Sequence, residues 1–318
     1  MRRLLVRLSV VSLVVVTAAC SSDEPDARSA GDINTLKVGV VPIVDVAPLY
    51  LGQKKGFYGK RGIKLQMVPA QGGAAVVPGV ISGQFSFGFS NVTSLILAQS
   101  KGIAVKGVSV ASASTGEQGA DYSGITVKNN SVIKTAKDLE GKKVAVNTLQ
   151  NIGDTSVRES VRRAGGDPAK IRFVELPFDQ MPAALDGGQI DAAWVSEPAL
   201  ATVKAQGGRV IASNYVDVDD NLTVALYFTS ARYAKENAEV VRKFREATAE
   251  SLAYAQAHPD DARQILATYM KIPEATTEQL VLPRWPVGVN RPSVEVLAEL
   301  GRKDGLFGTV PDLDELLP

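Results

Sequence analysis

Acidic and hydroxyl side chains near the ends of expected strands are the groups in this chain that could do chemistry. Asp154 and Glu197 could together act as a general acid and base. A serine nucleophile would lack a histidine partner, because His258 is the only histidine and precedes Pro259 near an expected helix end. The sequence also lacks a Gly-x-Ser-x-Gly elbow, a phosphate-binding loop and a dinucleotide-binding glycine motif after a strand. We therefore predict no catalytic residues and a protein that is not an enzyme.

Metal and nucleic-acid sites have little support. Cys20 is the only cysteine and His258 the only histidine, which excludes a Cys/His metal site and a disulfide within one chain. Carboxylate-only metal sites stay open, but the acids do not have the spacing of a calcium loop. The formal net charge is +1, and residues 1–19 contribute +3, so the remainder carries −2. We predict no metal, no cofactor and no nucleic-acid partner.

An internal repeat predicts the elements that would hold the candidate residues. Residues 80–91 (VISGQFSFGFSN) and 185–196 (LDGGQIDAAWVS) both indicate a helix end, a Gly-Gln turn, a strand and a polar loop. Upstream, KVGV at 37–40 matches KVAV at 143–146, and LQMVP from Leu65 matches FVELP from Phe173. Strands that alternate with helices favour a mainly parallel sheet with helices on both faces. The sequence therefore predicts an α/β protein with two such lobes.

The lobes are predicted to be linked by two crossings of the chain, near residues 121–124 and 222–225, which would form a hinge. Residues 224–229 indicate one more strand, and the chain beyond is mainly helical. The helices expected there are 238–257, 260–270, 278–282 and 293–302, all packed on the first lobe. We predict that lobe 1 comprises 36–122 plus 224–318 with these C-terminal helices, and that lobe 2 comprises 123–223.

Ligands of open parallel sheets bind at the carboxyl ends of the strands, and facing lobes would bring six such loops to one cleft. The residues that we predict to bind a ligand there are Asp45, Val46, Ser90, Asn91, Thr148, Asp154, Thr155, Glu197 and Trp285. Capping of a helix start is the alternative for Ser90 and Asp154, and a solvated helix-start charge is the alternative for Asp45 and Glu197. Trp194 is interpreted as a core residue, and Trp285 as a residue of the cleft rim or of the packing between lobes.

The N-terminal segment has the marks of an export signal. A basic head with Arg2, Arg3 and Arg7 precedes an apolar run and small residues before Cys20. A cysteine at this position resembles the lipobox of bacterial lipoproteins, which implies cleavage before Cys20 and lipid attachment to its thiol. We predict a signal peptide at 1–19 and, at 20–35, the lipidated cysteine followed by a flexible tether. An ordinary signal or a short anchor is the alternative.

Several stretches together resemble one protein family. They are 38–42 with 47–58, which contains APLYLGQKKGFY, 134–146 (KTAKDLEGKKVAV) and 190–198 (IDAAWVSEP). They are similar to the nitrate/sulfonate/taurine-type solute-binding proteins of ABC importers, which include thiamine-pyrimidine binders. The resemblance implies a two-lobed periplasmic-binding-protein fold of type II. It also implies an extracytoplasmic, lipid-anchored, monomeric protein that delivers a small polar solute to a membrane permease with a cytoplasmic ATPase.

Two alternative functions are weighed against import. One related branch of the family that the chain resembles consists of enzymes that make a thiamine pyrimidine, using their own histidine and a cysteine cluster. The expected folded part of this chain has neither feature. A ligand-sensing extracellular subunit would need a separate signalling partner. The expected cleft loops offer helix starts and the acids Asp45, Asp154 and Glu197, but no lysine or arginine. This favours a neutral, zwitterionic or amine-bearing ligand over a simple oxyanion.

Overall fold

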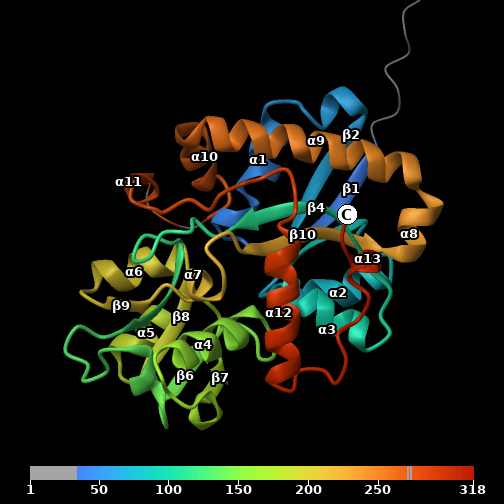
Figure 1. Ribbon diagram of the computed structural model, residues 1–318. Helices are drawn as coiled ribbons and strands as arrows, with labels where there is room; N and C mark the ends of the chain where they lie inside the picture. Colours follow the sequence, from blue (N-terminus) through green and yellow to red (C-terminus); the bar gives the residue numbers. More distant parts are fainter. Residues whose placement is uncertain (1–33, 271, 273) are drawn as a thin grey trace, which may run out of the picture. The chain divides into compact units, whose positions relative to one another are not determined.

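A computed structural model describes residues 34–270, 272 and 274–318 (Figure 1). The predicted signal peptide, Cys20 and most of the predicted tether lie outside the described residues. The first strand begins at Asn34, so the tether prediction of 20–35 extends two residues too far. Among the described residues, no helix is both long and apolar enough to cross a membrane.

The first sheet has the strand order β2-β1-β3-β10-β4. Strand β1 pairs in parallel with β2 and β3, whereas β10 pairs antiparallel with both β3 and β4. The strands are β1 (Asn34–Val40), β2 (Ile63–Pro69), β3 (Phe87–Asn91), β4 (Val105–Ala113) and β10 (Thr223–Ser230). A late strand of the chain is thus inserted beside strands from its beginning. We call these strands, with the helices that connect and flank them, the first-sheet region.

The second sheet repeats this arrangement in the order β7-β6-β8-β5-β9. Here β6 is parallel to β7 and β8, and β5 is antiparallel to β8 and β9. The strands are β5 (Ser123–Val127), β6 (Lys143–Val146), β7 (Arg172–Glu175), β8 (Ala192–Ser196) and β9 (Arg209–Ala212). The predicted α/β architecture with two mainly parallel sheets is confirmed, and each sheet contains one antiparallel strand in its fourth position. We call this part the second-sheet region.

The strand registers follow the internal repeat closely. Val38 pairs with Phe87 in the first sheet and Val144 with Ala192 in the second, which is the correspondence given by the sequence comparison. The outer pairing differs, because Val38 lies opposite Met67 but Val144 lies opposite Phe173. The sequence match had placed Leu65, not Met67, at the position of Phe173. A shift of two residues keeps every side chain on its face of the sheet, so the apolar pattern could not reveal it.

Helices cover both sheets. They are α1 (Ala47–Lys54), α2 (Gly73–Ile81), α3 (Val92–Ser100), α4 (Ile152–Arg163), α5 (Met181–Asp186), α6 (Ala199–Ala205), α7 (Asn214–Val218), α8 (Ala231–Glu236), α9 (Ala238–Ala257), α10 (Pro259–Leu266), α11 (Glu274–Thr277), α12 (Arg291–Lys303) and α13 (Leu313–Leu316). The helix predicted at 238–257 is confirmed. The one predicted at 278–282 is wrong: α11 ends at Thr277, a turn follows, and residues 280–283 belong to no helix or strand. Pro283 disfavours helical backbone at the residue before it.

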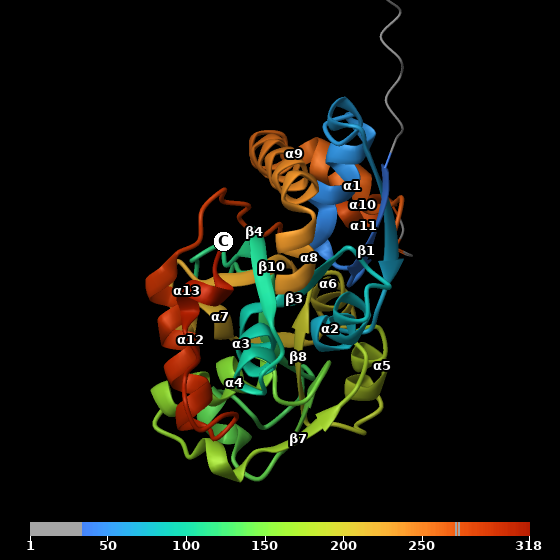
Figure 2. The same ribbon diagram turned by 90° about the vertical axis from the view of Figure 1, so that its right-hand side faces the viewer.

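The C-terminal helices do not all pack on the first-sheet region alone. Helices α9 and α10 pack on α1, as expected. Helix α12 contacts α3 and also α4 and α7 of the second-sheet region (Figures 1 and 2). Arg162 of α4 donates a hydrogen bond to Asp304, which follows α12. The C-terminal part of the chain therefore packs against both sheet regions.

The chain passes between the sheets twice, once between β4 and β5 and once between β9 and β10. The two crossing segments are bonded to each other. Gly119 N donates to Ser213 Oγ at 2.8 Å, and Gln118 Nε2 donates to Asp217 Oδ1 at 2.8 Å. From residue 34 onward the described chain forms one compact unit. The lobe limits and the hinge therefore stay predictions.

Candidate ligand-binding site

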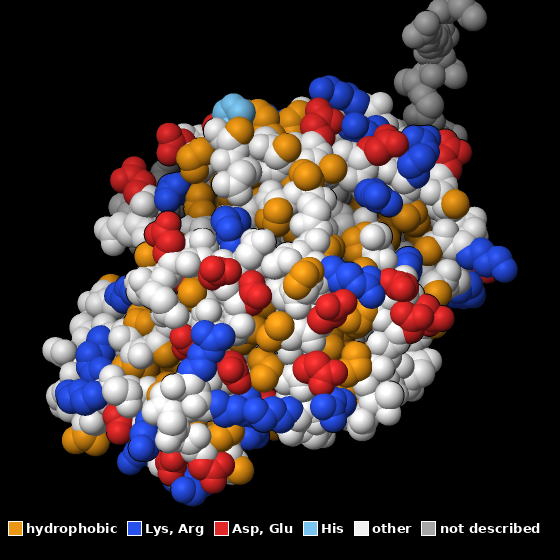
Figure 3. Space-filling view, in the orientation of Figure 1, with side chains coloured by type: hydrophobic (Ala, Val, Ile, Leu, Met, Phe, Trp, Pro, Cys, Tyr) orange, Lys and Arg blue, Asp and Glu red, His pale blue; other side chains and the backbone are white. Residues whose placement is uncertain are grey.

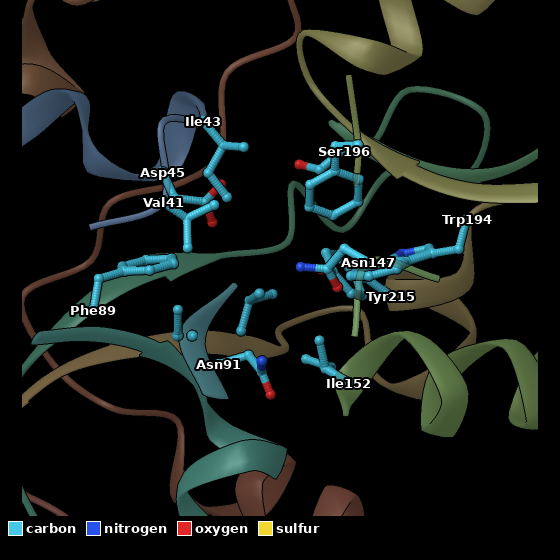
Figure 4. Close-up of a pocket in the computed structure, with 14 residues that line it drawn as sticks. Val41, Ile43, Asp45, Phe89, Asn91, Asn147, Ile152, Trp194, Ser196 and Tyr215 are labelled. Carbon is cyan, nitrogen blue, oxygen red and sulfur yellow. The ribbon is translucent and has the colours of Figure 1, made fainter. Parts of the chain in front are cut away.

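A cavity lies where carboxyl ends of strands from both sheets face each other. Its first-sheet wall is Val41, Ile43, Asp45, Gly73, Phe89, Asn91, Val224 and Ala225. Its second-sheet wall is Asn147, Ile152, Phe178, Trp194, Ser196 and Tyr215. Figure 4 shows the labelled members of the two walls on opposite sides of the space. The cavity volume is about 30 Å³, room for one or two water molecules.

The two walls are related by the internal repeat. Three positions in the first repeat line the cavity together with their counterparts in the second: Val41 with Asn147, Phe89 with Trp194, and Asn91 with Ser196. In both sheets the aromatic and polar positions are two residues apart on one strand, so their side chains share a face. Duplicated strands thus direct an aromatic and a polar group from each side into one space.

Asp45 is the acid of the first-sheet wall and is only 1 % exposed. Its Oδ1 accepts hydrogen bonds from Ser112 Oγ at 2.5 Å and from Tyr122 Oη at 3.2 Å. Its Oδ2 has no hydrogen-bond partner in the described part of the chain. Burial raises the pKa of Asp45 to about 6, against the opposing effect of the two hydroxyl donors.

Two aromatic residues donate hydrogen bonds to Asp45, and one of them belongs to a crossing segment. Trp285 Nε1 donates to the backbone oxygen of Asp45 at 3.2 Å, and Trp285 is 2 % exposed. Tyr122, at the first crossing, packs against Tyr215 of α7 near the second, with ring centroids 5.7 Å apart. Asp45 is therefore hydrogen-bonded to a residue of the first crossing, and that residue packs against α7 near the second.

Trp194 is the aromatic centre of the second-sheet wall. Its Nε1 donates to Ser123 Oγ at 2.9 Å, and its ring centroid lies 5.2 Å from that of Phe178 and 6.2 Å from that of Tyr215. A Cβ on Gly153 would lie 2.4 Å from the Trp194 ring, so α4 approaches this indole closely only because glycine stands there. The interpretation of Trp194 as a core residue was incomplete, since it is buried but also lines the cavity.

Two of the predicted ligand-binding residues, Asp45 and Asn91, line the cavity. Asn91 caps α3, accepting from Ser94 N at 2.9 Å. The structure does not bring the other seven into the lining, which are Val46, Ser90, Thr148, Asp154, Thr155, Glu197 and Trp285.

Four of these seven are buried or lie where the two regions meet. Val46 is a fully buried core residue. Ser90 is also fully buried, and its Oγ lies 2.4 Å from where a Cβ on Gly73 would be. Thr155 of α4 donates its hydroxyl at 3.2 Å to the backbone oxygen of Asn151, the residue that caps this helix. Thr148 lies where the regions meet, because its Oγ1 would be 2.5 Å from a Cβ on Gly72.

Glu197 joins the start of α6 to the C-terminal segment. Its Oε2 accepts from Ala201 N at 2.9 Å and its Oε1 accepts from Val281 N at 3.4 Å. The side chain is 1 % exposed, and burial raises its pKa to about 7. It follows the strand as predicted, but its partners are backbone amides within the protein.

Asp154 occupies the first turn of α4. Its Oδ2 accepts from Gln150 N at 2.8 Å, and within the described residues its Oδ1 has no hydrogen-bond partner. Burial raises the pKa of Asp154 to about 6, and Arg158 opposes that shift. The Asp154–Glu197 pair, considered above as an acid and base, does not line the cavity.

The lining is rich in aromatic and amide groups and poor in charge. Asp45 is its only charged residue, and none of the described lining residues is lysine, arginine or histidine. On the outer surface, by contrast, acidic and basic side chains are interspersed over the visible face (Figure 3). The cavity can therefore offer hydrogen bonds, one carboxylate and flat apolar surfaces, but no cationic side chain.

Comparison with known proteins identifies the family. A family model described as NMT1/THI5 like matches residues 43–262, which is more than half of the chain. The chain belongs to the NMT1/THI5-like family. Among the described residues, the match includes every cavity-lining residue except Val41.

Relatives of this NMT1/THI5-like chain are binding proteins. A Bacillus subtilis protein assigned as an aliphatic sulfonates-binding protein is 22% identical over 277 residues, covering 86% of this chain and 80% of its own. The riboflavin-binding protein RibY of Chloroflexus aurantiacus is 24% identical over 327 residues, covering 94% and 88%. The alkanesulfonate-binding protein SsuA of Xanthomonas axonopodis pv. citri, solved with MOPS, superposes with a TM-score of 0.76 at 19% identity, covering 91% and 99%. The predicted periplasmic-binding-protein fold is confirmed.

Proposed function

We propose that this chain is an extracytoplasmic solute-binding lipoprotein of an ABC importer. It captures a small polar organic solute between its two sheet regions and delivers it to a membrane permease driven by a cytoplasmic ATPase. The observation that carries the proposal is the cavity lined by repeat-related residues of both sheets, because a ligand held there contacts two parts of the chain at once. Cys20 carries the lipid anchor, and the protein works as a monomer.

Capture requires movement of the two regions. A cavity of about 30 Å³ is too small for a solute of several heavy atoms, so the regions separate to admit it and close over it. The two crossing segments are the hinge, and the Gly72 loop with Thr148 forms a closing contact at the mouth. Asp45 and Asn91 bind the solute, together with the lining residues that the sequence did not predict.

Binding without turnover is favoured over catalysis. The three acids whose pKa is raised to about 6 or 7 do not meet in the cavity: Asp45 lines it, whereas Asp154 and Glu197 bond to backbone amides elsewhere. The one histidine, His258, bonds Tyr254 O at a helix end. Asp45 alone is a binding group, because the described lining residues include no second acid and no histidine, lysine or arginine.

Calorimetric titration of the purified protein against amines, sulfonates, nitrate and pyrimidines tests this function. The expected result is saturable binding of one solute class, followed by recovery of the same solute unchanged by mass spectrometry. A chemically altered solute would refute the transport proposal in favour of an enzyme. Saturable binding without any effect of gene deletion on uptake of that solute would favour the sensing alternative.

A further inference from the structure

The cavity contains one buried acceptor that the protein itself leaves unused. Asp45 is 1 % exposed, and both hydroxyl donors near it, Ser112 and Tyr122, go to Oδ1. Oδ2 has no partner within the described residues, although an unpaired buried carboxylate oxygen is costly. Because Asp45 also lines the cavity, a bound ligand is the natural donor to this oxygen.

Within the described part of the chain, no positive side chain lines the cavity to hold an anionic ligand. Across the described lining residues, the polar groups besides Asp45 are the amides Asn91 and Asn147 and the hydroxyls of Ser196 and Tyr215. The other polar groups of the lining carry no net charge. The one carboxyl group, that of Asp45, belongs to the first-sheet wall. A sulfonate placed here would meet a carboxylate without a compensating cation.

We propose that the ligand of this site is an organic amine with a flat apolar body, and that its protonated amino group donates a hydrogen bond to Asp45 Oδ2. The proposal rests on the solute-binding function proposed above and specifies the ligand class of that same cavity. It differs from the ligand class of the sulfonate-binding relatives.

The aromatic wall suits the apolar body of such a ligand. Trp194, Phe178 and Tyr215 form a run of rings in edge and tilted contacts, with centroids 5.2 to 6.2 Å apart. Phe89 lines the opposite wall. A flat body between these walls gains burial and ring contacts, and a cation near a ring face gains further attraction.

Proton linkage distinguishes an amine from an anion. Burial holds the pKa of unliganded Asp45 near 6, so an amine that pairs with the carboxylate binds more weakly as the pH falls below 6. An anion would instead require protonation of Asp45, which lowers its affinity about tenfold at pH 7 and strengthens its binding at lower pH.

The other titratable groups around Asp45 do not change this sign. They are Asp121, Tyr122, Tyr215, Tyr227 and Tyr269. Burial holds the pKa of all four tyrosines well above the usual value, so they stay neutral from pH 5 to 8. Asp121 accepts bonds from Ser114 Oγ and Tyr122 N, and its charge raises the pKa of Asp45.

The test uses the full chain purified in detergent, titrated by calorimetry with benzylamine, 2-phenylethylamine and phenylmethanesulfonate. We expect an amine to bind at pH 7.5 more tightly than the sulfonate, and more weakly at pH 5. The decisive variant is Asp45→Asn. Its amide oxygen can still accept from Ser112 and Tyr122, while a donor replaces the acceptor that faces the cavity. Loss of this charged hydrogen bond predicts a ten- to hundred-fold weaker amine affinity.

Asp154→Asn is the matched control. It also removes a buried carboxylate with one unpaired oxygen and a pKa near 6, but Asp154 is outside the lining. It should leave amine affinity unchanged. Urea unfolding of both unliganded variants checks that each is folded.

Three results would overturn the ligand class. They are tighter binding of phenylmethanesulfonate than of both amines, no binding of either amine at millimolar concentration, and an unchanged amine affinity in folded Asp45→Asn. Binding of a sulfonate, with recovery of the unchanged solute, would refute the amine while leaving the solute-binding function standing. Turnover of a bound solute would refute that function itself.

Discussion

Ionisation of the buried Glu197 side chain should make the free energy of unfolding fall as the pH rises. Its pKa is raised from an ordinary 4.5 to about 7 by burial, and it is 1 % exposed. Because the folded pKa is above the unfolded one, its stabilising contribution is complete below pH 4.5 and is lost as the pH rises through 7. A shift of this size predicts a loss of about 2 kcal/mol in the free energy of unfolding between pH 5 and pH 8.

The perturbation is Glu197→Gln, which keeps the side-chain length and removes the ionisation. At pH 5 the native side chain is largely protonated, so the variant should be at most about 1–2 kcal/mol less stable, through imperfect bonding to Ala201 N and Val281 N. At pH 8 the native Glu197 side chain is buried and ionised, whereas the glutamine of the variant is neutral. The stability of the variant relative to the native protein should therefore rise by about 2 kcal/mol from pH 5 to pH 8.

Urea unfolding of both proteins at pH 5, 6, 7 and 8 measures this difference. Asp45 and Asp154 titrate in both proteins, so their contributions cancel. Parallel pH profiles would refute the assignment of a raised pKa to Glu197. Solute affinity at pH 7 is a second readout: a tenfold loss in the variant would restore the predicted ligand role of Glu197 and contradict the structural role argued above.

Two further changes test the closing contact and the anchor. Gly72→Val should weaken solute affinity roughly tenfold by holding the regions apart, since a Cβ there would lie 2.5 Å from Thr148 Oγ1 and 3.1 Å from Asn147 Nδ2. The extended backbone at Gly72 (φ −165°) accepts any residue, so an unchanged affinity in calorimetry would contradict the closing contact and not the fold. Cys20→Ser should release the protein from the membrane fraction on immunoblots, because lipidation supplies the membrane affinity. Full retention of this variant would contradict lipid attachment.

The repeat made much of the fold predictable. The matching stretches at 80–91 and 185–196 predicted the strands β3 and β8. They also predicted that β3 and β8 pair in equivalent register with β1 and β6. The insertion of β10 beside β3 was not predictable, because strand order depends on which edges the packed helices leave open. The segment at Val281, which belongs to no helix or strand, was missed for a related reason: its bond is to Glu197, 84 residues away.

The site was predictable only in part. Loops at strand ends pointed to Asp45 and Asn91, and the same repeat contained a signal for Trp194 and Ser196 as the counterparts of Phe89 and Asn91. Period-2 alternation then places both second-sheet residues on one face. Glu197 follows the end of β8 as expected, but it is one residue after Ser196, so its side chain is not on the face that lines the cavity. A sequence also cannot show that two backbone amides already donate to its carboxylate oxygens.

Small-angle X-ray scattering tests whether the two sheet regions close around a bound solute. The radius of gyration of the purified protein is measured without solute and with a saturating concentration of the solute that binds in calorimetry. We expect a smaller radius of gyration in the bound state, because a ligand that contacts both walls favours the closed arrangement. An identical radius of gyration with and without saturating solute would contradict it.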